Sequence, residues 1–239
     1  MYIQIFKKGF NFSQDGPGNR LVYHLQGCNL ICPWCANPEG MGAGGTAVLV
    51  QDLADEAVSC RAMFFSGGGV TLTGGEPTMQ LAAVCRLLRN LKENGIDTAM
   101  ETNGTHPELE RLFPLVDHLM MDCKHYDPGT LQKVVGAKKT VFDNLKKAAG
   151  GHPDLLIRIP LIGGFNASMK DAAGFAAFFS SLPTAKFRVE VLPYHEYGKS
   201  KWEALGIPYR MGQEAFVSAE QAAAFRQCLI NAGYTVVHT

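Results

Sequence analysis

The stretch VTLTGGEPTMQLAAVCRLLRNLKENGIDTAMET, residues 70–102, carries two strand patterns with one helix pattern between them. Short runs rich in β-branched and apolar residues occupy 70–76 and 97–102, whereas apolar residues in 77–95 recur at helical spacing. Pro77 near the first turn and Gly95 after the last turn are typical helix boundaries. The stretch therefore predicts a right-handed βαβ unit with two parallel strands.

The same alternation continues on both sides of this unit. Further strand patterns lie at 20–27, 117–124, 154–162 and 186–193, with a short terminal one at 234–238. Helix patterns lie at 52–65 (with Asp52 as the expected N-cap), 140–151, 168–182 and 218–233. Six such units predict an α/β fold, a partial and laterally open (β/α)6 barrel of parallel strands that is TIM-barrel-like, because the chain is slightly short for eight units. No repeat or linker divides it, so residues 1–239 are predicted to form one domain.

The charge balance bears on the expected class of partner. Lys plus Arg and Asp plus Glu both number 22, so the formal net charge is zero. This balance gives no support for a nucleic-acid or anionic-membrane partner. No apolar run reaches membrane-spanning length, and the N-terminal sequence MYIQIFKKGF lacks the apolar segment of a signal peptide. We therefore expect a cytoplasmic monomer whose cysteines are thiols or metal ligands rather than disulfides.

Polar residues gather at the carboxyl ends of the predicted strands, which in barrel-like α/β folds form the rim that holds the active site. Five strands contribute such residues: Glu76, then Glu101 and Thr102, then Asp122 and Lys124, then Arg158 within its strand, and His195 just after the last. Each residue alone could be a helix cap or a surface charge. Their agreement across five strands predicts a functional site at this rim.

Three closely spaced cysteines, Cys28, Cys32 and Cys35, stand in the run GCNLICPWCANPE at 27–39. Thiolates suit zinc, Cu(I) and iron–sulfur clusters. Three ligands rather than four predict a metal centre with one open coordination position, which is a place for chemistry. A structural zinc site completed by Cys123 or His24 remains an alternative at this point, as does a [4Fe–4S] cluster with one free iron. Cys60, Cys85 and Cys228 lie in helical patterns and are expected to be small buried apolar residues.

The spacing C-x3-C-x2-C, with the aromatic Trp34 before the last cysteine, resembles the signature of the radical S-adenosylmethionine (SAM) superfamily. Further motifs resemble the glycyl-radical-enzyme activating enzymes, the family that includes pyruvate formate-lyase activating enzyme. They are DGPGNR (15–20), SGGGVTLTGGEP (66–77), ETNG (101–104), MMDCK (120–124), IR (157–158) and LPYHEYGKSKW (192–202). Many members carry a cysteine-rich ferredoxin insert after the first motif, and this chain resembles the minimal form without it.

The resemblance implies a set of cofactor contacts. Cys28, Cys32 and Cys35 would bind a [4Fe–4S] cluster, and the amino and carboxylate groups of SAM would chelate the fourth iron. The backbone of Gly74 and Gly75, with the carboxylate of Glu76, would meet the methionine amino group. The remaining SAM contacts implied by the resemblance are Trp34 beside adenine, Lys124, Arg158 and His195 in the pocket, and Pro160 and Leu192 as apolar contacts.

The resemblance also implies a site for Na⁺ or K⁺ formed by Glu101, Thr102, Met120 and Asp122. Oxygen ligands from two carboxylates and backbone carbonyls suit such a hard cation. Three positions depart from pyruvate formate-lyase activating enzyme. Glu101 stands where that enzyme has Asp, Ala36 where it has His, and Pro77 where it has Ala. These departures bear on the cation geometry and on which lyase is the partner.

The implied activity is that of an oxidoreductase. Reductive cleavage of SAM gives a 5′-deoxyadenosyl radical, which takes a hydrogen from one glycine of a partner glycyl radical enzyme. A flavodoxin or ferredoxin is the implied reductant, and the implied setting is anaerobic. One alternative is a radical SAM enzyme with another substrate, such as an activase of anaerobic ribonucleotide reductase or a small-molecule isomerase or synthase. The other is a zinc-stabilised binding protein without catalysis.

Overall fold

The computed structural model describes residues 1–184 and 186–238, and residues 70–102 form the predicted βαβ unit. Strand β4 (Gly69–Gly74) lies parallel to β5 (Asp97–Thr102), and helix α2 (Leu81–Glu93) connects them. The segment Pro77–Gln80, predicted as the start of this helix, is a separate 3-10 turn, η3. Gly95 adopts a φ of +63° just after α2, as expected for a residue that ends a helix.

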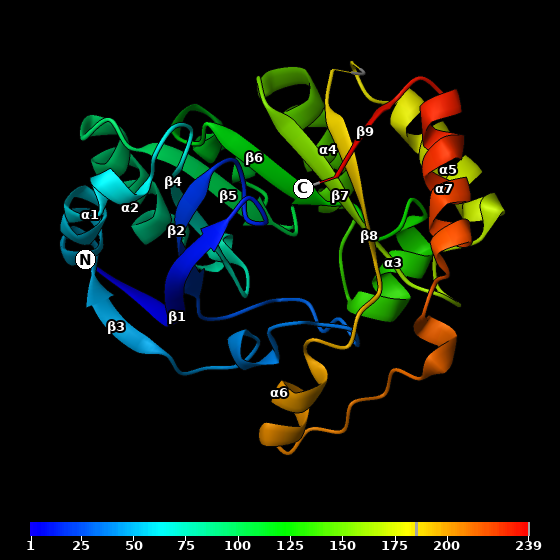
Figure 1. Ribbon diagram of the computed structural model, residues 1–239, viewed down its shortest axis with the longest axis horizontal. Helices are drawn as coiled ribbons and strands as arrows, with labels where there is room; N and C mark the ends of the chain where they lie inside the picture. The colour runs from blue at the N-terminus through cyan, green and yellow to red at the C-terminus, as the bar shows by residue number, and fades with distance from the viewer. Residues whose placement is uncertain (185, 239) are drawn as a thin grey trace.

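The described strands form one open sheet with the order β3-β1-β2-β4-β5-β6-β7-β8-β9 (Figure 1). Every neighbouring pair from β2 to β9 is parallel, as the βα alternation predicted. The chain therefore forms a partial barrel that does not close, with β3 and β9 at its two edges. The remaining strands are β2 (Asn19–Leu25), β6 (His118–Asp122), β7 (Leu155–Leu161), β8 (Arg188–Pro193) and β9 (Thr235–Val237).

Two strands precede or interrupt the predicted alternation. Strand β1 (Tyr2–Phe12) forms an antiparallel hairpin with β2, and β3 (Thr46–Leu49) pairs antiparallel with β1 at the edge. The sequence analysis did not find them. Lys7, Lys8 and Gly9 interrupt the apolar alternation of β1, and the pairing itself shifts register between Ile5 and Lys7.

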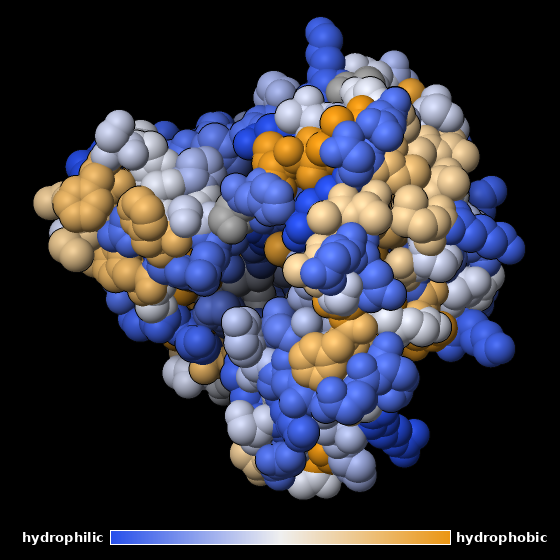
Figure 2. All heavy atoms as spheres, turned by 45° about the vertical axis from the view of Figure 1, so that its right-hand side comes forward, coloured by the Kyte–Doolittle hydropathy of each residue, from blue (hydrophilic) through white to orange (hydrophobic). Residues whose placement is uncertain are grey.

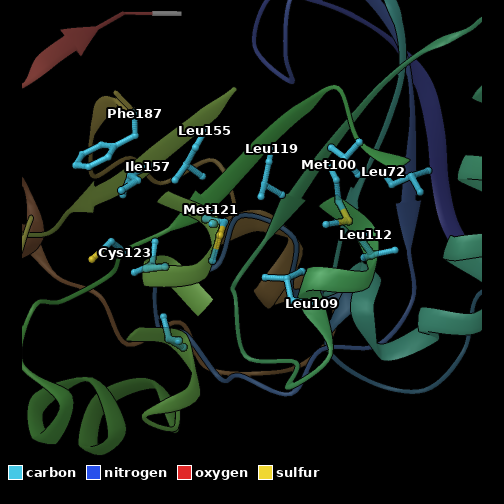
Figure 3. Close-up of a cluster of buried hydrophobic side chains, with 14 of the residues drawn as sticks. Leu72, Met100, Leu109, Leu112, Leu119, Met121, Cys123, Leu155, Ile157 and Phe187 are labelled. Carbon is cyan, nitrogen blue, oxygen red and sulfur yellow. The ribbon is translucent and has the colours of Figure 1, made fainter. Parts of the chain in front are cut away.

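Helices cover the outer face of the sheet (Figure 1). They bury their apolar sides against the strands in one large core, part of which appears in Figure 3, where Met100 and Leu119 lie near Leu109 and Leu112. The helices not yet given are α1 (Val50–Ser59), α3 (Pro128–Val135), α4 (Thr140–Gly151), α5 (Met169–Ser180), α6 (Lys199–Ala204) and α7 (Ala219–Asn231), with 3-10 turns η1 (Pro38–Gly40), η2 (Arg61–Met63), η4 (Leu109–Leu115) and η5 (Gln213–Ala215). In the described part of the chain, no helix is both long and apolar enough to cross a bilayer.

Two helix expectations need correction. Helix α1 begins at Val50 with Leu49 as its N-cap, so Asp52 lies in the first turn instead of capping it, and the helix ends at Ser59, well before residue 65. Helix α3 was not predicted. Its N-cap, Asp127, accepts a hydrogen bond from the Thr130 backbone N–H at 2.8 Å, and Gly136 ends it with a φ of +79°.

The inner face of the sheet combines buried polar side chains with a small apolar cluster of Ala99, Met120 and Leu156. In β2 the residues Leu21, Tyr23 and Leu25 join the outer core, so the alternate residues, Arg20 among them, face the barrel interior. Arg20 is fully buried; its Nε donates to Thr71 Oγ1 at 2.7 Å and its Nη2 pairs with Asp97 at 2.8 Å. Charged groups in the interior are thus paired and hydrogen-bonded, as burial requires.

The turn between β1 and β2 lies against this inner face. The Pro17 carbonyl accepts a hydrogen bond from Arg20 Nη1 at 3.0 Å, and the Asp15 carbonyl accepts one from Thr71 Oγ1 at 2.7 Å. Gly18 has a φ of +69°, and a Cβ there would lie 2.6 Å from the Gly68 backbone nitrogen. The motif DGPGNR at 15–20 therefore forms a turn that Arg20, its last residue, holds against the sheet by hydrogen bonds.

His118 links the starts of three strands. Its Nδ1 lies 2.5 Å from Asp154 and its Nε2 lies 3.1 Å from Asp97. The hydrogen bond to Asp97 raises the pKa of His118 above its usual value, with a second contribution from Asp154, although burial opposes the shift. The imidazolium is thus bound by two carboxylates, because both ring nitrogens can then donate.

Replacing His118 by Gln should lower the free energy of unfolding by roughly 2 kcal/mol at about pH 6, the usual worth of hydrogen bonds to charged groups. A group whose folded pKa is raised stabilises the fold fully below its unfolded pKa of 6.5 and loses that contribution as the pH rises through the folded pKa. Urea denaturation of the metal-free protein should therefore show a smaller gap between the two proteins at about pH 9. An equal gap at both pH values would contradict this assignment.

Candidate functional site

The three cysteines lie in the loop that follows β2, and they line one cavity of about 230 Å³. The neck of this loop is closed by backbone hydrogen bonds, since Gly27 N donates to the Gly40 carbonyl at 2.9 Å. The Gln26 side-chain amide adds two more, to the carbonyls of Glu39 and Gly42 at 2.9 and 2.8 Å. The loop is therefore a fixed lobe that presents its thiols to the rim of the barrel.

Burial controls the chemistry of these thiols. It raises the pKa of Cys32 to about 12 and that of Cys35 to about 11, and it also raises the pKa of Cys28. A thiolate becomes favourable there only with a positive centre beside it.

The geometry favours a cluster over one zinc ion. Among the described residues, no three His, Cys, Asp or Glu side chains are grouped so that they could hold one metal ion. The three thiols instead line one common cavity, which offers space for a group larger than a single ion. Cys123 is buried with its Sγ near the His125 carbonyl, and His24 lines a separate cavity, so neither joins the three cysteines at this cavity. This arrangement fits a [4Fe–4S] cluster and does not support the zinc alternative.

Two glycines at the end of β4 form another part of the cavity wall. Gly74 has a φ of +114°, and a Cβ on Gly75 would lie 2.2 Å from the Gly27 carbonyl oxygen. Only glycine permits this approach of the β4 end to the cysteine loop. The bare backbone of the two residues is thus available to a ligand in the cavity.

Glu76 lies behind this wall and does not line the cavity. Its carboxylate is buried and accepts hydrogen bonds from Thr78 N at 3.1 Å, Thr78 Oγ1 at 2.5 Å, Thr102 Oγ1 at 2.7 Å and Asn103 N at 2.7 Å. The donors on Thr102 and Asn103 join the end of β4 to the end of β5, whereas those on Thr78 are local to the turn η3. In this structure Glu76 therefore orients the rim, whereas the backbone of the preceding glycines faces the cavity.

Lys124 and Asp122 form a buried ion pair that lines the same cavity. Burial alone would lower the pKa of the Lys124 ammonium, but the facing Asp122 carboxylate raises it above its usual range. Lys124 is consequently charged at all physiological pH values. Its charge also favours the thiolate form of Cys32 and Cys28.

Arg158 reaches across the barrel interior and is bound on every side. Its Nε pairs with Glu190 at 2.7 Å, its Nη1 pairs with Glu101, and its Nη2 donates to the Gln14 carbonyl at 2.6 Å. Glu101 in turn accepts a hydrogen bond from Thr73 Oγ1 at 2.6 Å. Arg158 lines the cavity, and its guanidinium also holds the β1–β2 turn against β7.

A second cavity of about 210 Å³ adjoins the first, since both are lined by Cys32, Cys35, Asp122, Lys124 and Leu192. Its walls are largely apolar. The Trp34 ring lies 4.9 Å from that of Phe165, and the His195 ring stacks on Tyr197 at 4.1 Å. The predicted contacts Trp34, Pro160, Leu192 and His195 all line this second cavity.

The four residues of the predicted cation site also come together at the first cavity. Glu101, Thr102, Met120 and Asp122 all line it. Each carboxylate already has a cationic partner, Arg158 for Glu101 and Lys124 for Asp122. A bound Na⁺ or K⁺ would have to compete with these side chains.

Two asparagines that sequence reasoning missed contact the thiols. Asn37 N donates to Cys35 Sγ at 3.4 Å, and Asn103 Nδ2 lies 3.9 Å from Cys28 Sγ. Such donors to sulfur tune the reduction potential of an iron–sulfur cluster. Asn103 follows β5 within the motif ETNG at 101–104, and this position at a strand end is the signal that could have revealed it.

Comparison with known proteins agrees with this geometry. The profile of the radical SAM superfamily matches residues 22–176. The pyruvate formate-lyase-activating enzyme of Staphylococcus epidermidis is 32% identical over 209 residues, which cover 82% of this chain and 83% of the relative.

Solved structures add to this likeness. A domain of pyruvate-formate lyase-activating enzyme from Bacteroides vulgatus superposes with a TM-score of 0.58 at 26% identity, covering 72% of this chain and 98% of that domain. A radical SAM methyltransferase from Sphaerobacter thermophilus shares the fold, with a TM-score of 0.71 at 17% identity over 95% of this chain and 67% of the other. By its cysteine loop, its open parallel sheet and these relatives, the chain belongs to the radical SAM superfamily and, within it, to the pyruvate formate-lyase-activating enzyme family.

Proposed function

We propose that this chain activates a glycyl radical enzyme by reductive cleavage of SAM at a [4Fe–4S] cluster. One observation carries the proposal: three thiols, a bare glycine backbone and a buried ion pair line a cavity that continues into an apolar one. Cys28, Cys32 and Cys35 would hold three irons and leave the fourth for the methionine end of SAM. When bound, the cluster and SAM supply the electron and the 5′-deoxyadenosyl radical.

The protein's own residues position SAM and exclude water. The permanently charged Lys124 suits the methionine carboxylate, and the backbone of Gly74 and Gly75 suits the amino group. The apolar side chains Trp34 and Leu192 would cover the adenine, with Pro160 beside them and His195 at the rim. Such enclosure keeps a reactive species from side reactions with solvent.

The proposal extends to the cation, the partner and the reductant. Na⁺ or K⁺ at Glu101, Thr102, Met120 and Asp122 remains part of it, in competition with the ion pairs described above.

The gap between β3 and β9 leaves one side of the barrel open, through which a glycine-bearing loop of a large protein could approach. Figure 2 shows a recess in one face of the molecule with hydrophilic residues around it. A flavodoxin or ferredoxin would deliver the electron. The proposal also takes residues 1–239 as a single domain, which the continuous sheet supports.

Incubation of the reduced, cluster-loaded protein with SAM and candidate glycyl radical enzymes tests this function. We expect a glycine-centred doublet by electron paramagnetic resonance (EPR), and no doublet when the acceptor glycine of the candidate is replaced by alanine. Cleavage of SAM with turnover of a small metabolite, and no doublet with any candidate, would assign the chain to another radical SAM reaction. A colourless protein with one zinc and no iron would overturn the proposal.

A further inference from the structure

Helix α6 and its N-cap residue, Gly198, contact the cysteine loop at Cys35 and the two residues that follow it. Trp202 Nε1 donates to the Cys35 carbonyl at 2.9 Å, and Lys201 Nζ donates to the Ala36 carbonyl at 2.8 Å. Lys201 also donates to Asn37 Oδ1 at 2.7 Å and pairs with Glu39 at 3.2 Å. Two consecutive side chains of one short helix thus bind the backbone of the loop at two consecutive carbonyls.

The backbones approach each other closely at the start of this contact. Gly198 is buried, and a Cβ added to it would lie 2.3 Å from the Cys35 carbonyl oxygen and 3.0 Å from Ala36 Cα. The fit therefore leaves no space for a side chain at this position. Three residues of GKSKW at 198–202 contact the short segment Cys35–Asn37, and we call them the rim clamp. They are Gly198, Lys201 and Trp202.

The rim clamp joins elements that follow two widely separated strands of the sheet. The cysteine loop follows β2, whereas α6 follows β8, and β4, β5, β6 and β7 lie between these two strands. Helix α6 contacts η1 of the loop directly. Figure 1 shows α6 below the sheet, beyond the end of β8. The clamp therefore ties the segment after β2 to the segment after β8 across the rim of the open sheet.

We propose that Gly198, Lys201 and Trp202 are positioning residues that hold Cys35 in place for the cluster and set the cluster's reduction potential. This inference rests on the proposed function, because it requires that Cys35 binds iron. The clamp fixes the carbonyl side of Cys35 through Trp202, so that the thiol faces the cavity and receives the Asn37 N–H. The nearby ammonium of Lys201 and the indole N–H favour the more negative, reduced cluster.

Two substitutions test the clamp on the cluster-loaded full chain. Lys201→Met keeps the aliphatic stem and removes the ammonium, and Trp202→Phe keeps a ring and removes the N–H. Lys199→Met is the matched control, because Lys199 lies in the same helix, is half exposed and pairs only with Glu196 in the described contacts. We expect iron loss to a chelator to be about tenfold faster in both clamp variants, the usual effect of changing a partner of a metal ligand.

A second readout separates positioning from folding. EPR-monitored titration should give a more negative midpoint potential in Lys201→Met than in wild type and Lys199→Met, and thermal unfolding of the metal-free proteins should confirm that each variant folds. If Lys201→Met fails to fold, Trp202→Phe decides the question, because its ring still packs beside Tyr209.

The outcomes are distinguishable. Iron loss and potential that match wild type in both clamp variants would overturn the clamp and leave the proposed function intact. A Lys199→Met variant that changes as much as Lys201→Met would also overturn it, because the effect would then be one of net charge. Failure of the wild-type chain to bind any cluster would overturn the proposed function and the clamp together.

Discussion

Replacing Cys32 by Ala is expected to remove most of the bound iron and to abolish SAM cleavage. Cys32 is the most deeply buried of the three thiols, and its side chain lines both cavities of the site. A cluster left with two protein thiolates loses one of its three anchors, and no nearby cysteine can replace it, since Cys123 does not line the cavity. Iron and sulfide analysis after anaerobic reconstitution, with 5′-deoxyadenosine release as the activity, measures both effects.

Cys85→Ala is the matched control for this experiment. Cys85 is also buried, but it lies in α2 and belongs to the apolar core. We expect the control to bind about four irons, the complement of one cluster, and to cleave SAM at the wild-type rate. A Cys32→Ala protein that retains full iron and cleavage would show that the cluster is held elsewhere.

Replacing Arg158 by Met is expected to cost about 3–5 kcal/mol of folding free energy, the usual result when one partner of a buried ion pair is removed. The guanidinium is the shared countercharge of Glu101 and Glu190, and it also holds the Gln14 carbonyl. Methionine keeps the length of the side chain and none of these interactions. Urea denaturation of the metal-free protein measures the loss without interference from the cluster.

Two comparisons identify the cause of this loss. Arg188→Met removes the exposed partner of Asp154 and should cost about 1 kcal/mol or less. Adding Glu101→Gln to Arg158→Met should recover part of the stability, because it removes one uncompensated negative charge. The deficit of Arg158→Met should also shrink as the pH falls, since the buried Glu101 carboxylate, without the arginine that lowers its pKa, becomes neutral more readily. A variant as stable as wild type would show that the arginine is not the countercharge.

The sequence predicted most of the parallel sheet, because each strand from β2 to β8 has its own apolar run followed by a helix pattern. The sequence also predicted that polar residues would gather at the carboxyl ends of the strands, and the reason is physical. The carboxyl ends of parallel strands meet at one edge, so Asp122 at the end of β6 and Lys124 just after it had to lie near Leu192 of β8. The hairpin strand β1 escaped prediction because its polar middle breaks the alternation that identifies a half-buried strand.

The partners of charged side chains could not be predicted from the sequence. The pattern GGE suggests a carboxylate that faces a ligand, but Glu76 turns away from the cavity toward donors on Thr78, Thr102 and Asn103. Arg158 likewise satisfies Glu101 and Glu190, a pairing across three strands that no local motif indicates. Local patterns fix where a residue stands along a strand, whereas the direction of its side chain depends on segments far away in the chain.

The rim clamp has a consequence for the order of events during synthesis. Its hydrogen bonds join residues 165 and 167 positions apart, so Cys35 emerges from the ribosome long before Lys201 and Trp202 exist. Until then the thiol-bearing loop lacks the anchor that fixes its backbone. If the clamp secures the cluster, we expect stable iron–sulfur loading to be a late, post-translational step, and a chain that stalls before residue 202 to carry its three cysteines without this anchor.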